Sequence, residues 1–183
     1  SEARVSVAKD SLAREEPLEI RLASSSGPDS AVAVTMRTPG HDFELAAGFL
    51  FSEGVLKSRK DVTEIRYCTG PDVPEYNIVT VELRDPSAVQ LSDIQRNFYT
   101  TSSCGVCGKA SIEEVEALVP DSCVKSDARL AGAVIRRLPT KLRESQALFE
   151  KTGGADGSVV FGLDGAVRWV REDVGRHNAV DKV

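Results

Sequence analysis

The sequence predicts a mixed α/β or α+β fold in which helices pack on a sheet. Short β-rich runs occur in both halves of the chain, stripes of apolar residues at helical spacing separate them, and we find neither an internal repeat nor a low-complexity linker. The 183 residues, 41% of them hydrophobic, are enough for a substantial core. We divide the chain into an N-terminal β-rich portion with one long helix, residues 1–98, and a second portion, residues 99–183.

The first elements form a predicted hairpin followed by a helix. Residues 17–22 and 31–36 alternate or run apolar, as strands do, and the polar segment between them has the composition of a turn. Within residues 37–55, Thr38-Pro39 is a plausible helix start, apolar residues recur at helical spacing, and Gly54 is a plausible stop. This is the clearest helix in the sequence.

Two more strands are predicted at residues 62–68 and 76–84. The second alternates in a way that suits a half-buried antiparallel strand. Farther along, a helix opens at Leu138-Pro139 and ends at Thr152-Gly153-Gly154. The segment between these elements contains the chemically most informative residues of the chain.

The C-terminal elements are a hairpin and the beginning of a helix. Residues 158–162 and 166–170 flank Asp164-Gly165, which is a strong hairpin signal, and we expect Phe161 and Trp169 in the sheet core. Residues 171–183 read as a strand end, a glycine turn and the first turns of a helix, so we expect the chain to be cut short at its C-terminus.

Charge and composition narrow the class of protein. The net charge of −5 argues against a nucleic-acid binder. The cluster of Arg136, Arg137, Lys141 and Arg143 is expected to be a solvated helix face, with a local anion site for a phosphate-bearing ligand as the alternative. No secretory signal opens the chain and no apolar run approaches the ~20 residues of a membrane span. We therefore expect a cytoplasmic protein with reduced thiols.

The segment TSSCGVCGK, residues 101–109, contains Cys104 and Cys107 two residues apart. An amphipathic helical pattern follows at once, so both sulfur atoms are expected near a helix N-terminus, where unpaired N–H groups favour a thiolate. Lys109 adds a nearby positive charge. A thiolate in this setting is a nucleophile or a metal ligand before it is a packing residue.

Three roles are open for the cysteine pair. A structural zinc site usually needs four ligands, whereas Cys68 and Cys123 are lone residues that we expect to be inert. A thioredoxin-type dithiol normally follows a strand early in a βαβ unit and often has proline between its cysteines. The third role is a thiolate that accepts a sulfane sulfur and passes it on. Spacing alone does not favour this third role.

Two histidines lie near carboxylates. On a continuous helix Asp173, His177 and Asp181 would share a face that could bind a metal or orient a base, but an exposed capping and salt-bridge pattern is the expected reading. His41 and Glu44 are likewise expected to form a helix-end pair. We assign no metal ligand from these patterns.

Four blocks of the sequence resemble the FdhD family, the formate dehydrogenase accessory sulfurtransferases. They are spread over most of the chain in the order found in the family: EEPLEIRL (15–22), VTMRTPGHDFELAAGFLFSEGV (34–55), TSSCGVCGKASIE (101–113) and REDVGRHNAVDK (171–182). Blocks of this length are far more specific than a single C-x-x-C.

The resemblance implies a sulfur relay. Such proteins take persulfide sulfur from a cysteine desulfurase and deliver it to the molybdenum (or tungsten) bis-guanine-dinucleotide cofactor, which then enters formate dehydrogenase. The guanine ends of that cofactor imply affinity for GDP-like ligands. The resemblance also implies a core similar to the cytidine deaminase fold, and a homodimer.

Site residues follow from the matching positions. Cys104 would carry the persulfide and Cys107 would accept or relay its sulfur. Residues near the cofactor would be Arg176, His177 and Asn178, with Arg37, Lys109 and Arg171 as further candidates for its anionic phosphates. Two features differ from the family: Asp156 stands where a histidine is usual after T-G-G, and the family continues past this point with a segment expected to contribute to cofactor binding.

Two other functions remain as alternatives. A zinc-dependent nucleobase deaminase also places C-x-x-C at a helix start, but it needs an upstream H-x-E and a proline before the first cysteine, where this chain has Ser103. Metal analysis distinguishes that class. A cofactor-binding chaperone without sulfur chemistry is the other alternative, and sulfur-transfer competence of the isolated protein separates it from a sulfurtransferase.

Overall fold

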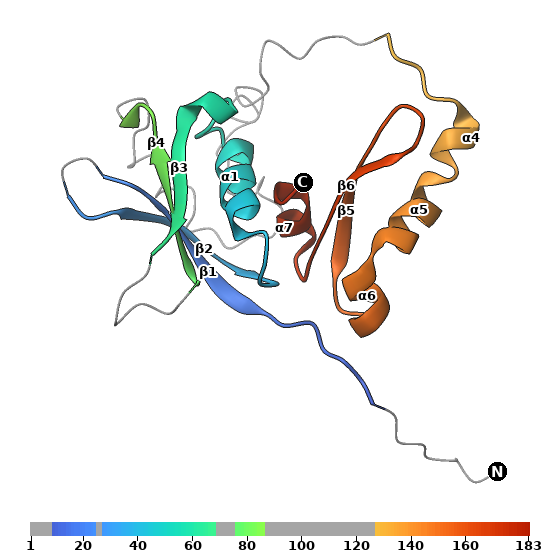
Figure 1. Ribbon diagram of the computed structural model, residues 1–183, viewed down its shortest axis with the longest axis horizontal. Coiled ribbons are helices and arrows are strands. Elements are labelled where there is room, and N and C mark those ends of the chain that lie inside the picture. Colours follow the sequence, from blue (N-terminus) through green and yellow to red (C-terminus); the bar gives the residue numbers. More distant parts are fainter. Residues whose placement is uncertain (1–8, 25–26, 69–75, 87–126) are drawn as a thin grey trace, which may run out of the picture.

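The computed structural model of the protein describes residues 9–24, 27–68, 76–86 and 127–183 (Figure 1). A four-stranded sheet carries helix α1 on one face, and a two-stranded hairpin carries three short helices on its outer side. The C-terminal helix α7 lies between these two parts and contacts both. The predicted mixed α+β class is confirmed.

The four-stranded sheet has the order β2-β1-β4-β3. Its strands are β1 (Glu16–Leu22), β2 (Ser30–Arg37), β3 (Val62–Tyr67) and β4 (Ile78–Leu83). Strands β1 and β2 pair antiparallel, as do β3 and β4, whereas β1 and β4 pair parallel. Both predicted strand pairs are therefore confirmed, and the parallel β1–β4 pair joins them into one sheet.

Strand β4 departs from the half-buried pattern expected from its alternation. In this strand Glu82 is exposed, while the other five residues are buried, including the polar Thr80 at 0% exposure. The reason is that both faces are covered: Val79, Val81 and Leu83 pack in the core with α1, and Asp29 and Cys68 contact Thr80 on the other face. The Thr80 hydroxyl is accommodated because it donates a 3.0 Å hydrogen bond to Asp29 Oδ2.

Helix α1 (Asp42–Ser52) packs Leu45, Ala46 and Leu50 into the core beneath the sheet. Its start differs from the prediction: Thr38-Pro39 precede the helix, and His41 is the N-cap residue, in the left-handed conformation with φ 57°. The predicted stop at Gly54 is confirmed, with φ 76°. A short 3₁₀ turn, η1 (Arg59–Asp61), then leads into β3.

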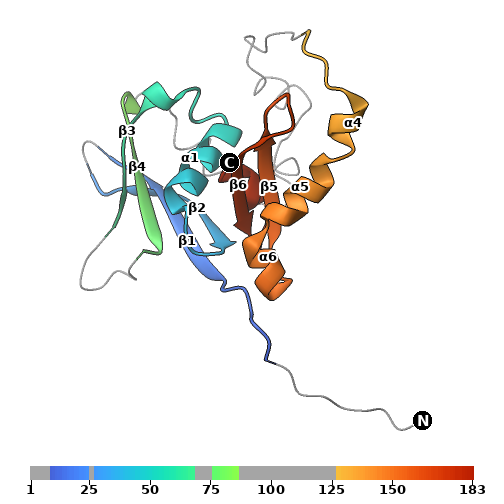
Figure 2. The ribbon, with the colours of Figure 1, turned by 45° about the vertical axis from the view of Figure 1, so that its right-hand side comes forward.

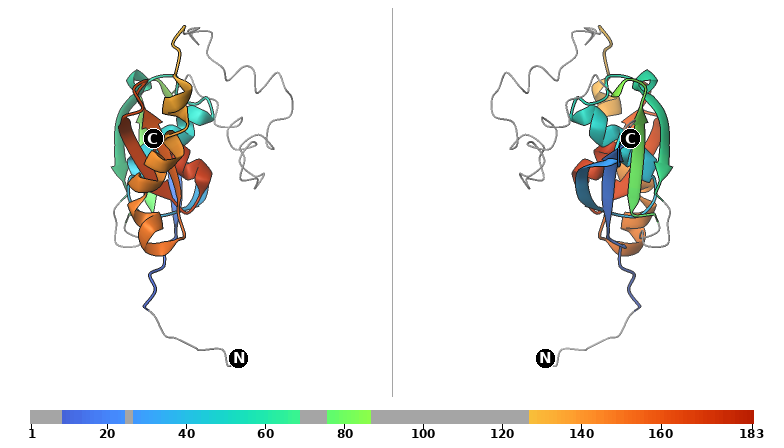
Figure 3. Two further views of the ribbon diagram at one scale, coloured as in Figure 1. Left: turned by 90° about the vertical axis from the view of Figure 1, so that its right-hand side faces the viewer. Right: turned by 90° about the vertical axis from the view of Figure 1, so that its left-hand side faces the viewer.

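The second part of the molecule is a hairpin with a helical layer. Its elements are α4 (Gly132–Ile135), α5 (Leu138–Ser145), α6 (Ala147–Thr152), β5 (Asp156–Phe161), β6 (Val167–Asp173) and α7 (Arg176–Asp181). Viewed from the side in Figure 3 (left), α4, α5 and α6 lie in front of the β5–β6 hairpin. The hairpin predicted at Asp164-Gly165 is confirmed, with Gly165 at φ 73°.

The single helix predicted from Leu138 to Thr152 is two helices in the structure. The chain leaves helical geometry at Gln146, with φ −89° and ψ 81°. Helix α6 begins anew because the Glu172 carboxylate accepts hydrogen bonds from the N–H groups of Leu148 and Phe149, both at 2.8 Å. A residue of β6 thus sets a helix boundary that local sequence could not show.

Trp169 does not lie in the sheet core as expected. Its exposed fraction is 57%, and its cross-strand neighbour Val160 is 38% exposed, while Phe161 is half-buried. The described residues cover the opposite end of the same face of β6, where Arg171 and Asp173 reach α1 and the loop before it. Among the described residues, the layer on this face reaches Arg171 and Asp173 but not Trp169, and the predicted core position is wrong for this reason.

The predicted portion boundary at residues 98 and 99 lies outside the described residues and stays a prediction. Within the described part of the chain, no helix combines the length and the apolar character that crossing a bilayer requires.

Candidate functional site

Helix α7 lies tightly against α1. A Cβ atom at Gly48 of α1 would be 1.8 Å from the carbonyl oxygen of Asp181, so only glycine permits this approach. Next to this contact, Ser52 Oγ donates a 2.8 Å hydrogen bond to Asp181 Oδ1. The final helix therefore has a fixed position on the first one, and this position governs where its exposed side chains lie.

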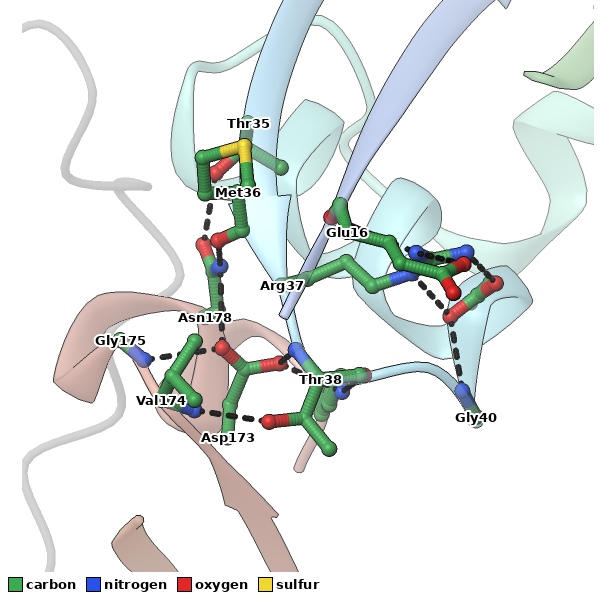
Figure 4. A network of polar contacts seen from close by, with 12 residues as sticks. Glu16, Thr35, Met36, Arg37, Thr38, Gly40, Asp173, Val174, Gly175 and Asn178 are labelled. Atoms are coloured by element: carbon green, nitrogen blue, oxygen red, sulfur yellow. Dashed lines mark hydrogen bonds and ion pairs between the residues drawn. The ribbon is translucent and has the colours of Figure 1, made fainter. Parts of the chain in front are cut away.

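The carboxylate of Asp173 is the centre of the junction between the two parts (Figure 4). Oδ1 accepts hydrogen bonds from Gly175 N at 2.9 Å and Asn178 Nδ2 at 3.2 Å. Oδ2 accepts from Thr38 N at 3.0 Å and forms a 2.6 Å ion pair with Lys182 Nζ. Four donors compensate a carboxylate whose residue is 0% exposed.

Thr38 and Asn178 complete this network. The Thr38 hydroxyl accepts from Val174 N at 3.1 Å, and its carbonyl accepts from Lys182 Nζ at 2.8 Å. The Asn178 amide donates to the carbonyl of Met36 at 2.8 Å. The segments 34–55 and 171–182, far apart in sequence, are thus joined through hydrogen bonds that are mostly part-buried (Figure 4).

Arg37 lies beside this junction in a network of its own. It is 1% exposed, and its Nε and Nη2 atoms donate to Asp42 at 3.1 and 2.8 Å. The same guanidinium also donates to the carbonyls of Tyr76 at 3.0 Å and Glu16 at 3.3 Å. In the described part of the chain the Arg37 guanidinium is bound by internal partners, and its role in binding a cofactor stays a prediction.

Arg171 forms an exposed cluster with Glu44 and His41. Its Nη2 donates to Glu44 Oε1 at 3.3 Å, and His41 Nδ1 lies 3.2 Å from the same oxygen. Burial raises the pKa of Glu44, but its own backbone N–H, His41 and Arg171 together outweigh this and leave the pKa below its usual value. The Arg171 Nε atom is buried without an acceptor in the described part of the chain.

The exposed side of α7 carries Arg176, and His177 is half-buried beside it. Burial raises the pKa of Asp181, Ser52 and His177 lower it, and Glu53 adds to the rise. The helix starts at Arg176, so Asp173 is not on its face but caps the turn before it through Gly175 N. The predicted capping role thus agrees with the geometry, whereas the predicted exposure is wrong, because Asp173 is 0% exposed.

Comparisons with known proteins show the family of the chain. A model of the FdhD/NarQ family matches residues 13–183. The chain belongs to this family. It is 49% identical over 177 residues to a protein of Mycolicibacterium paratuberculosis named sulfur carrier protein FdhD, covering 95% of this chain and 63% of that protein. The protein of the same name from Streptomyces coelicolor is 46% identical over 183 residues, covering 98% and 63%.

One solved structure supports the fold of this family member. It is a protein of Desulfotalea psychrophila described as a candidate formate dehydrogenase accessory protein, with a TM-score of 0.63 and 24% identity. The match covers 94% of this chain and 57% of that one. The chain spans 63% of the length of the two relatives above. The activity and the partners of the whole protein are therefore proposed below.

The cysteine pair predicted for this FdhD/NarQ chain lies outside the described residues. Cys104, Cys107, Lys109 and Cys123 all fall in the segment between residues 86 and 127. Cys68 is described: it is a half-buried free thiol whose Sγ lies 3.2 Å from Thr80 Oγ1. Cys68 is thus more accessible than the buried thiol expected, and its inertness stays a prediction.

The sequence pointed to several residues of the candidate site, but it did not predict the polar contacts around Asp173 that join the two parts of the molecule. It singled out Arg171, Arg176, His177 and Asn178, and the structure brings all four to one end of β6 and the start of α7. It read Thr38 as a helix start and Asp173 as part of an exposed capping pattern, gave Lys182 no role, and did not predict that these three residues hold this region together. Hydrophobic periodicity does not show which polar groups meet.

Proposed function

We propose that this chain is the catalytic part of a sulfurtransferase that carries persulfide sulfur from a cysteine desulfurase to the molybdenum or tungsten bis-guanine-dinucleotide cofactor of formate dehydrogenase. The observation that supports it most is the FdhD/NarQ match over residues 13–183, a range that includes Cys104 and Cys107. The names of the relatives as sulfur carriers agree with this chemistry. We expect the carrier to act as a homodimer in the cytoplasm.

The loading step is a thiolate displacement. The Cys104 thiolate attacks the outer sulfur of the donor persulfide, a new S–S bond forms at Cys104, and the S–S bond of the donor breaks. The donor cysteine leaves as a thiolate, so no external oxidant or reductant is needed. A lowered thiol pKa favours this step because the thiolate is the reactive form.

Delivery requires reduction of the transferred sulfur. The sulfane sulfur must gain two electrons to become the sulfide bound by the metal of the substrate cofactor. Cys107 can supply them when its thiolate attacks Sγ of Cys104, which releases sulfide and leaves a disulfide between the two cysteines. A dithiol reductant then restores the pair. In this scheme Cys107 is the resolving thiol that releases the sulfide, a role that follows from electron balance.

The cofactor would approach the start of α7. Its phosphates are anionic, and Arg176 is an exposed cation there, with His177 half-buried and Arg171 nearby on β6. Asn178 donates to Met36 O and Asp173 and thereby fixes the helix that presents Arg176. In this proposal Arg171, Arg176 and His177 contact the nucleotide end, while Asn178 holds them in place.

Mass spectrometry after incubation with a cysteine desulfurase and cysteine tests the proposal. We expect the wild-type protein to gain one sulfur atom on Cys104 and Cys104→Ala to gain none there. Cys68→Ala is a control that removes a described thiol on the four-stranded sheet and should load normally. Equal sulfur loading and equal formate dehydrogenase activation by wild type and Cys104→Ala would contradict the assignment.

A further inference from the structure

Two basic side chains share one carboxylate oxygen where α1 meets β6. Oε1 of Glu44 lies 3.2 Å from Nδ1 of His41 and 3.3 Å from Nη2 of Arg171. Helix α1 lies on the side of the β5–β6 hairpin that faces the four-stranded sheet, in two views that differ by 45° (Figure 1 and Figure 2). These three residues are called the His41 cluster below.

The His41 cluster is open to solvent on the side of the histidine. The side chains of His41 and Glu44 are 53% and 45% exposed, whereas that of Arg171 is 20% exposed. The contact through Nδ1 leaves Nε2 of His41 without a partner among the described residues. An imidazole held through one nitrogen can gain or lose a proton, and histidine does so between about pH 5 and 8.

The backbone gives His41 an unusual place at the N-cap of α1. Its φ of 57° and ψ of 33° lie in the left-handed region, which few residues other than glycine adopt. Histidine, asparagine and aspartate enter this region more readily than most residues. Asparagine can therefore replace His41 with little change of the turn, which provides a matched variant without a titrating ring.

Arg171 can bind an anion in addition to its internal contacts. Its Nη1 donates to the carbonyl of Val170 at 2.8 Å, and its Nε has no acceptor in the described part of the chain. The 3.3 Å contact of Nη2 with Glu44 is longer than the ~2.7–2.9 Å of a strong charge-assisted hydrogen bond. A phosphate group can therefore join or replace Glu44 at this guanidinium.

Glu44 keeps its charge over the range in which a histidine titrates. The pKa of Glu44 lies below its usual value, so the carboxylate is ionised above about pH 5. The hydroxyl of Tyr67 on β3 is close enough to sense this charge, but burial raises the pKa of Tyr67, and the ring stays neutral. Glu44 therefore provides His41 with a constant negative neighbour.

The other charges next to the His41 cluster are paired with one another. Asp42 follows His41 in the chain, and its carboxylate is buried against Arg37 at 2.8 Å. Lys182 and Asp173, beyond the loop before α1, form the buried pair described above. In the described part of the chain, the charges that face the imidazole are thus Glu44 and Arg171.

We propose that an anion bound at Arg171 causes His41 to take up a proton from solvent. The phosphate contact of Arg171 rests on the proposed function. In the free protein the Arg171 cation opposes a positive charge on His41, because both side chains contact the same oxygen of Glu44. A bound phosphate neutralises that cation and adds a negative charge, while Glu44 still accepts from the imidazolium.

The coupling makes His41 a determinant of affinity. Because coupling between two sites is reciprocal, a proton on His41 must strengthen anion binding by the same factor as the anion strengthens proton binding. We expect the affinity for GDP to rise about fivefold more between about pH 8 and about pH 6 in wild type than in His41→Asn. Comparison with this variant removes the contributions of GDP itself and of His177.

NMR of the imidazole groups tests the coupling directly, since the chain has 2 histidines. The variants His41→Asn and His177→Asn assign the two signals. Adding GDP at about pH 7 should move the His41 signal of wild type toward its protonated position, and should not move it in Arg171→Gln. Arg59→Gln removes an exposed cation on η1 and is the control that should respond like wild type.

Calorimetric titration with GDP in buffers of different ionisation enthalpy counts the protons taken up. Wild type should take up clearly more protons per bound GDP than His41→Asn. Glu44→Gln removes the carboxylate that competes for Arg171, so at about pH 8 it should bind GDP about twofold to fivefold more tightly. Glu64→Gln, an exposed change on β3, should bind like wild type.

Three results would overturn the coupling. These are a His41 signal that GDP leaves in place, an equal movement of that signal in Arg171→Gln, and equal proton uptake by wild type and His41→Asn. No binding of GDP to wild type would overturn it together with the phosphate contact of Arg171. Thermal unfolding checks that each variant is folded, and the comparison with His41→Asn does not depend on the Arg171 variant.

Sulfur loading separates this inference from the sulfurtransferase function. Loading of Cys104 by a cysteine desulfurase is read by mass and needs no bound nucleotide. A protein that loads Cys104 but takes up no proton at His41 retains the proposed function and refutes the coupling. A protein that shows the coupling but never loads Cys104 refutes the sulfurtransferase function alone.

Discussion

Lys182 and Asp173 form an ion pair of 2.6 Å in which the two side chains are 1% and 0% exposed. Both charges are removed from water, and both find further partners: Lys182 also donates to Thr38 O, and Asp173 accepts three more hydrogen bonds. The pair connects α7 and the end of β6 to the loop after β2. It is the polar centre of the contact between the two parts of the molecule.

Breaking this pair from one side should be costly. Lys182→Met leaves the Asp173 carboxylate buried without its cation, and we expect the free energy of unfolding to fall by about 3–5 kcal/mol. Urea unfolding followed by circular dichroism measures the change. The double variant Lys182→Met/Asp173→Asn should lose clearly less than the sum of the two single losses, because the residues interact directly. Additive losses would show that the two charges are not coupled.

The close approach of α1 and α7 makes Gly48 irreplaceable by alanine. A Cβ there would meet the Asp181 backbone at 1.8 Å, so α7 must move, and we expect Gly48→Ala to destabilise by about 2–3 kcal/mol. Gly132→Ala is the matched control in α4, where the nearest atom to a new Cβ is the flexible Arg136 Nη1 at 3.6 Å. It should be neutral or stabilising by about 0.5 kcal/mol. Similar unfolding midpoints for the two variants would contradict the packing.

Asp181 should make stability depend on pH. Burial raises its pKa in the folded state, so ionisation is less favourable there than in the unfolded chain, and stability is lost as pH rises through the folded pKa. Asp181→Asn avoids this cost and can still accept from Ser52 Oγ. The variant should be more stable than wild type near about pH 7, and its advantage should shrink toward about pH 4. Urea unfolding at both pH values measures this, and an advantage that grows on acidification would contradict it.

Arg176 should matter for ligand binding and little for folding. It is exposed on α7, so Arg176→Ala should leave the free energy of unfolding within about 0.5 kcal/mol of wild type. If it contacts a nucleotide phosphate, affinity for GDP should fall about tenfold, or ~1.4 kcal/mol. Calorimetric titration with GDP measures this, with Arg59→Ala as an exposed control. Equal affinities in the two variants would remove Arg176 from the proposed site.

Much of the local structure could be predicted because it depends on nearby residues. Asp164-Gly165 specified its hairpin through turn geometry, and Gly54 ended α1 through its positive φ. Predictions failed where a distant residue decides the outcome. Glu172 of β6 separates α5 from α6, and the neighbours of β4 bury a strand whose alternation suggested one exposed face. These failures share one cause, a partner far away in sequence.

The candidate site likewise has a part that the sequence predicts and a part that only the tertiary structure decides. Local sequence identified the cysteine pair, and the resemblance to one family pointed to the cations of the C-terminal block, because short motifs preserve chemistry that depends on residue type and spacing. The tertiary structure decided that Arg37 is enclosed by Asp42 and backbone carbonyls, and that Thr38 meets Asp173 and Lys182. Hydrogen bonds between buried groups depend on geometry set by the whole fold, and no local pattern in the sequence records which donor will meet which acceptor.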